Sequence, residues 1–111
     1  MAELTPESIM AEVKAGKPYT LVLLKKGPNF HATAHLQMEH LKHIFTMRHA
    51  GQQLITIPIM DAESELAGIG LFATANKEEA ARLTAADPAV VAGRLTFEIL
   101  GCMALPGDAV K

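Results

Sequence analysis

Five histidines, gathered in one part of the chain, are the side chains best suited to acid–base chemistry. They lie at positions 31, 35, 40, 43 and 49, in or beside a stretch from 32 to 50 that has no Gly or Pro and predicts a long helix closed by Gly51. At helical spacing only His40 falls on the apolar side, near Ile44 and Met47. The other four are expected to be solvated. His40 is either a core histidine bonded to a backbone carbonyl or an imidazole at a cavity edge that transfers protons.

The histidine spacing also raises a metal site, because His31/His35 and Glu39/His43 each lie one helical turn apart. The pattern lacks a Cys partner and an HExxH motif. We therefore expect His35, Glu39 and His43 to hold no functional metal.

Asp87 is the second singular residue, because it follows two alanines and precedes Pro88. An Asp at the N-cap with Pro at the first helical position is a common start for a helical turn. Its distance along the chain does not bring it near His40; only a fold can do that. No nucleophile is evident, since Cys102 falls in a predicted strand and Ser8 and Ser64 in terminal or turn regions. No cofactor motif is present, and no cofactor is expected.

The elements that must position these residues follow from hydrophobic pattern and turn residues. Strands are expected at 19–24, 53–59, 66–74 and 95–103, and helices at 5–15, 32–50 and 77–86, with a short helical turn at 89–92. The order after the first helix is β-α-β-β-α-β, which predicts an α+β, ferredoxin-like unit with both helices on one face of a four-stranded antiparallel sheet. Three parts are expected: an N-terminal helical extension over 1–17, the ferredoxin-like domain over 18–105, and a tail over 106–111.

The first two strands are apolar on both faces, so the sheet face away from the helices needs a cover. A second copy of the sheet would provide it, which predicts a homodimer through the sheet faces. The 111 residues carry a net charge of −2 and only 5% aromatic side chains, which disfavours nucleic-acid and membrane-surface partners. The single cysteine and the absence of a signal-peptide pattern over 1–10 predict a cytoplasmic protein.

Three segments resemble the YCII-like family in order and spacing. They are His40-Leu41-Lys42-His43 leading to Ala50-Gly51, then Glu78-Glu79-Ala80-Ala81, and then Ala86-Asp87-Pro88-Ala89-Val90-Val91-Ala92-Gly93 before the last strand. The resemblance covers about 19–105 and implies a ferredoxin-like fold that forms a dimeric α/β barrel. It also implies a catalytic His–Asp pair in a pocket, carried here by His40 and Asp87. Family members resemble muconolactone isomerase in fold, and one branch removes chloride from a chlorinated hydroxyhydroquinone.

Two departures from the family bear on the pocket. Ile57-Pro58 stands where Gly-Pro is usual, and the helix over 5–15 is an addition that covers a barrel end or extends the dimer contact. The pocket is expected beside His40, lined by the long helix, by strands near Tyr19 and Ile57, and by the turn after Asp87.

Two functions remain open from the sequence. One is a cofactor-independent enzyme in which His40 is the general acid/base and Asp87 orients it, for isomerisation or for elimination of a small anion from a ring compound. The other is a non-catalytic small-ligand-binding or dimerisation module with a structural His–Asp bond. The two differ in whether the imidazole reaches an open cavity.

Overall fold

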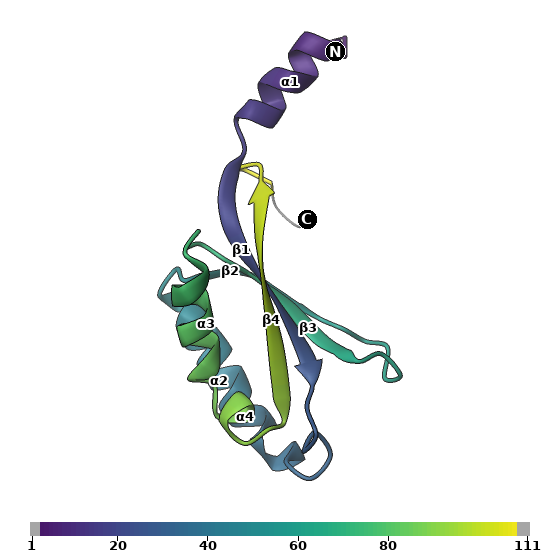
Figure 1. Ribbon diagram of the computed structural model, residues 1–111, viewed down its shortest axis with the longest axis vertical. Coiled ribbons are helices and arrows are strands. Elements are labelled where there is room, and N and C mark those ends of the chain that lie inside the picture. Colours follow the sequence, from purple (N-terminus) through teal and green to yellow (C-terminus); the bar gives the residue numbers. More distant parts are fainter. Residues whose placement is uncertain (1–2, 109–111) are drawn as a thin grey trace.

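The helices and strands follow one another in the order α-β-α-β-β-α-α-β, with one 3-10 turn before the second helix, and they fold into the predicted α+β arrangement (Figure 1). The computed structural model describes residues 3–108, and in that range it has one four-stranded antiparallel sheet in the order β2-β3-β1-β4, with four α-helices. The elements are α1 (Pro6–Lys14), β1 (Lys17–Lys26), the 3-10 turn η1 (Ala34–Leu36), α2 (Gln37–His49), β2 (Gln53–Pro58), β3 (Leu66–Phe72), α3 (Lys77–Ala85), α4 (Pro88–Val91) and β4 (Leu95–Ala104). This order is compatible with a ferredoxin-like fold.

One face of the sheet carries the core. Val22 in the central strand β1 lies opposite Gly70 of β3 and Ile99 of β4, and alternation along the strands sends these positions toward the helices. Val22 and Phe72 pack there against Met47 of α2 and Ala80 of α3. The expectation that both main helices cover the same face is confirmed.

The opposite face of the sheet, which we call the open face, is also apolar. Leu21 of β1 lies opposite Leu71 of β3 and Leu100 of β4, so three leucines meet at its centre. Leu21 and Leu71 are half-buried and Leu100 is exposed. No helix within residues 3–108 packs on this face (Figure 1).

The long helix is shorter at its N-terminal end than expected. Residues 29–33 form turns, 34–36 form η1, and α2 begins only at Gln37. The backbone there makes bonds outside a helix: the Phe30 carbonyl accepts from Arg94, and the Asn29 N–H donates to Gly93 O at 3.0 Å. At the other end α2 stops where expected, because Gly51 adopts a φ of 75° that other residues avoid.

The N-terminal extension stands apart from the core. Thr5 caps α1 through a bond from the Ser8 N–H to its side chain, and Pro6 occupies the first helical position, as expected. No residue of α1 is buried, and the helix projects from the end of the sheet farthest from α4 (Figure 1). Of the predicted extension and tail, residues 1–2 and 109–111 lie outside the described range. Within that range, none of the helices combines the length and apolarity needed to cross a bilayer.

Candidate functional site: a histidine–aspartate pair on an apolar cavity

His40 lies on the face of α2 that is turned toward the sheet. It shares that face with Ile44 and Met47, at spacings of four and seven residues, and all three are buried. His40 is 7% exposed. Its position inside the apolar arc, expected from the sequence, is confirmed.

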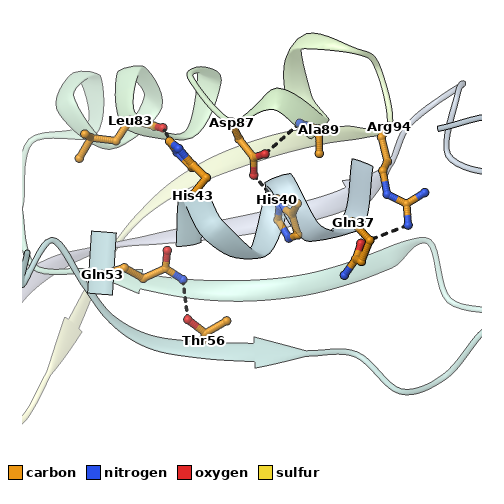
Figure 2. A network of polar contacts seen from close by, with 9 residues as sticks. All are labelled: Gln37, His40, His43, Gln53, Thr56, Leu83, Asp87, Ala89 and Arg94. Atoms are coloured by element: carbon orange, nitrogen blue, oxygen red, sulfur yellow. Dashed lines mark hydrogen bonds and ion pairs between the residues drawn. The ribbon is translucent and has the colours of Figure 1, made fainter. Parts of the chain in front are cut away.

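Asp87 approaches His40 from α4. The residue is extended, with φ −62° and ψ 125°, as expected for a residue before proline, and it is the N-cap of α4. One carboxylate oxygen, Oδ1, accepts from the Ala89 N–H at 2.9 Å. The other, Oδ2, accepts from His40 Nδ1 at 2.5 Å (Figure 2). The capping role and the pairing with His40 are therefore both present, each on its own oxygen.

The second imidazole nitrogen of His40 is the chemically available one. Within residues 3–108, His40 Nε2 has no hydrogen-bond partner, and it is not among the fully buried side-chain atoms. Because the Nδ1–H donates to Asp87, Nε2 carries the lone pair and can accept a proton. The sequence left open whether the imidazole reaches a cavity, and in the structure it does.

His40 lines a cavity of about 470 Å³ between α2 and the β2–β3 end of the sheet. Most of its wall is apolar, with contributions from Leu24, Leu41, Ile44 and Ile57. A volume of this size is in the range of small-molecule sites. The expected contributions from the long helix and from the strand near Ile57 are confirmed.

Two other parts of the expected lining differ from the structure. The strand near Tyr19 contributes through Leu24 and Lys26, which face the helices, whereas Tyr19 itself lies on the open face because side chains alternate along β1. The turn after Asp87 does not line the cavity either. Its residue Ala89 is buried, and the wall on that side is made by Arg94 and Leu95 at the start of β4.

Arg94 is the main site residue that the sequence analysis missed. It is 7% exposed, lines the same cavity as His40, and places its guanidinium 4.2 Å from the centre of the Phe30 ring. One Nη donates to the Phe30 carbonyl. The other donates to Gln37 Oε1 at 3.2 Å (Figure 2). The sequence did contain one signal for its burial: Arg94 is a single charged residue between a short apolar helix and an apolar strand, where both flanking segments are expected to be buried.

Two of the four histidines expected to be solvated have other surroundings. His43 is half-buried and donates from Nε2 to the Leu83 carbonyl at 2.8 Å, which ties α2 to α3. His31 is exposed but lines the cavity and packs edge-on against Phe30, with ring centroids 5.3 Å apart. Residues 3–108 contain no group of three His, Cys, Asp or Glu side chains arranged to hold a metal ion.

The candidate nucleophiles lie away from His40. Cys102, Ser8 and Ser64 are all absent from the cavity wall. Cys102 pairs with Tyr19 across β4 and β1, and partial burial raises the pKa of its thiol, so little thiolate forms near neutral pH. Among the described residues, His40 is thus the group on this cavity best placed to move a proton.

Together these features define a small α+β protein in which a buried His–Asp pair opens on an apolar cavity. No family model matches the chain, and no curated protein is significantly similar to it. The YCII-like assignment therefore stays a prediction from the three sequence segments described above.

Proposed function

We propose that this chain is a YCII-like, cofactor-independent enzyme that transfers a proton on a small ring compound. His40 is the general acid/base through Nε2, and Asp87 orients the imidazole and stabilises the imidazolium that forms. The observation that carries the proposal is that the two imidazole nitrogens of His40 have different surroundings. Nδ1 is bonded to Asp87, whereas Nε2 has no partner within residues 3–108 and His40 lines a cavity of about 470 Å³. A purely structural histidine would have both nitrogens satisfied by protein.

The proposed chemistry needs only a base that returns its proton or loses it to solvent. In an isomerisation, Nε2 takes a proton from one carbon or hydroxyl, the electron pair moves along the ring, and the imidazolium returns the proton elsewhere. In an elimination, the pair released by the broken C–H or O–H bond forms the new double bond, and chloride leaves with the C–Cl pair. The second route is the one implied by the family branch that acts on a chlorinated hydroxyhydroquinone.

A second candidate is a non-catalytic module that binds a small ligand. It is favoured by the capping bond from Ala89 to Asp87, which gives the aspartate a structural role that needs no reaction. The same cavity would then hold an apolar ligand, with His40–Asp87 as a fixed polar contact.

A substrate screen separates the two candidates. We expect the purified protein to convert at least one member of a panel of small lactones and halogenated phenols, followed by absorbance and by chloride release. No metal or organic cofactor should be needed in the assay. Binding of several panel members without conversion of any would favour the non-catalytic module.

We also propose that two copies pair through their open faces to form a dimeric α/β barrel. Leu21, Leu71 and Leu100 meet at the centre of this face, and Ile55 of β2 lies opposite Leu71. An uncovered apolar sheet face of this kind marks an association surface. The N-terminal helix α1 is then placed to extend the contact, because Ile9 and Val13 are exposed on it.

Leu21→Lys is expected to convert the dimer into a monomer, because it would place a charge among leucines at the centre of the contact. Light scattering coupled to size exclusion at micromolar concentration measures the change. Val91→Lys is the matched control, since Val91 is 76% exposed on α4, away from this face. A wild-type protein that is monomeric at this concentration would contradict the dimer.

A further inference from the structure

Arg94 is a buried cation without a counter-ion. Its side chain is nine-tenths buried or more, at 7% exposure, and no carboxylate oxygen of residues 3–108 lies within ion-pair distance of the guanidinium. Burying a charge is costly unless the charge is paired or fully hydrogen-bonded. The partners that Arg94 has are neutral: the Phe30 carbonyl, the Gln37 side chain and the Phe30 ring.

The guanidinium also has unused donors. It carries five N–H groups, and the contacts to Phe30 and Gln37 use two of them. Its Nε is fully buried and has no acceptor within residues 3–108. A planar fork of N–H donors fits the two oxygens of a carboxylate better than a single acceptor.

Hydrogen bonds between the loop before α2 and the start of β4 fix the position of Arg94. The Gly27 N–H donates to the Arg94 carbonyl at 2.8 Å, and the Asn29 side chain donates to Ala92 O at 3.0 Å. These bonds hold the loop that carries Phe30 against the start of β4, so the ring lies over the guanidinium. The surroundings fix the orientation of Arg94 while leaving its charge uncompensated.

The other charges on the cavity wall do not neutralise Arg94. Lys26 lines the cavity but donates from Nζ to the Ala62 carbonyl at 2.5 Å. Asp61 is the acidic residue of the wall; it is exposed and forms no ion pair with Arg94. Asp87 is engaged by His40 and by Ala89.

We infer that the cavity binds a small carboxylate with an apolar body, and that Arg94 holds its carboxylate. The apolar part lies against Leu41, Ile44 and Ile57, on the same wall as His40 Nε2. This inference rests on the proposed function and names its substrate class: an acid whose charged end is anchored at Arg94 while a proton elsewhere on it faces His40. An anchored charge of this kind positions the reacting atoms and contributes binding energy.

Benzoate and benzamide are probes of nearly equal shape that differ in charge. We expect the wild-type protein to bind benzoate roughly tenfold to a hundredfold more tightly than benzamide, as a charge-assisted contact predicts. Backbone amide shifts in a titration followed by nuclear magnetic resonance measure both affinities and locate the ligand, with the largest changes expected near Arg94 and Ile57. Arg94→Met should bind the two compounds equally, whereas Lys26→Met, which removes the other cation of the wall, should keep the preference.

The wild-type comparison decides the inference even where Arg94→Met does not fold. Equal affinities for benzoate and benzamide, or shifts confined to another surface, would overturn the carboxylate site, and turnover of an uncharged ring compound would still support His40 as the acid/base. A preference for benzoate that persists in a folded Arg94→Met protein would also overturn it. Charge-selective binding at Arg94 together with no turnover, in a screen extended to carboxylated lactones and phenols, would support the carboxylate site and reject the enzyme.

Discussion

Replacing His40 with alanine is expected to lower turnover by roughly 10²- to 10⁴-fold, the usual loss for one positioned general base. The effect follows because Nε2 of His40 is the proton acceptor on the cavity wall. The other imidazole of the wall, His31, is exposed and has no carboxylate partner among residues 3–108 to orient it. The measurement is kcat/KM on whichever compound the screen identifies. His49→Ala is the matched control, because His49 is exposed in the same helix.

The alanine variant leaves Asp87 buried without its partner, so loss of folding must be separated from loss of chemistry. His40→Gln serves this purpose, because its amide can still donate to Asp87 but cannot act as a base at neutral pH. A folded His40→Gln protein with wild-type turnover would show that His40 is not the acid/base.

The second large effect is a contrast between two substitutions at Asp87. Asp87→Ala removes the α4 cap and the acceptor for His40 at a buried position, and should lower the free energy of unfolding by about 3 kcal/mol. Asp87→Asn keeps an oxygen for the Ala89 N–H and should cost less. It replaces the acceptor facing Nδ1 with an amide donor, so the imidazole proton moves to Nε2 and the base is lost. We expect an asparagine variant that is folded but reduced in turnover by roughly 10²- to 10⁴-fold.

Urea unfolding and turnover, measured on the same preparations, test this contrast. Asn76→Ala is the control for capping alone, because Asn76 caps α3 by accepting from Glu78 and Glu79 and touches no part of the cavity. It should cost about 1 kcal/mol without a change in turnover. If Asp87→Asn is as active as the wild type, Asp87 is a cap and the pair has no catalytic role.

Local patterns were sufficient to predict most of the fold. Alternation in the strands, the Thr5-Pro6 start, the Asn76 and Asp87 caps and the stop at Gly51 each depend on a few neighbouring residues, and all are present. The order of strands and helices then predicts that both main helices pack on the same face of the sheet. Patterns at this scale are physically local and can therefore be recognised in one sequence.

The parts that were wrong or missed depend on residues far apart in the chain. The expected helix start at 32 is wrong: residues 31–33 form turns and 34–36 form η1, directly after a loop that Gly93 and Arg94 bind at Asn29 and Phe30. Arg94 itself was missed because its burial comes from Phe30 and Gln37, more than fifty positions away. The lining expected from the strand near Tyr19 comes from its other end, at Leu24, because alternation places the Tyr19 and Leu24 side chains on opposite faces of the sheet. His40 and Asp87 were paired through a resemblance, since no local pattern joins them.

The central position of β1 also determines the order in which the molecule can be assembled. β1 precedes the other three strands of the sheet along the chain, yet its neighbours are β3, at 66–72, and β4, at 95–104. Both pairings close long loops, which costs chain entropy before any contact is gained and slows folding. Until β4 is available, Leu21 to Leu24 present an unpaired apolar edge, the kind of surface that promotes aggregation of partly made chains. Folding is therefore completed late, and a chain ending before Leu95 would lack one of the two neighbours of β1.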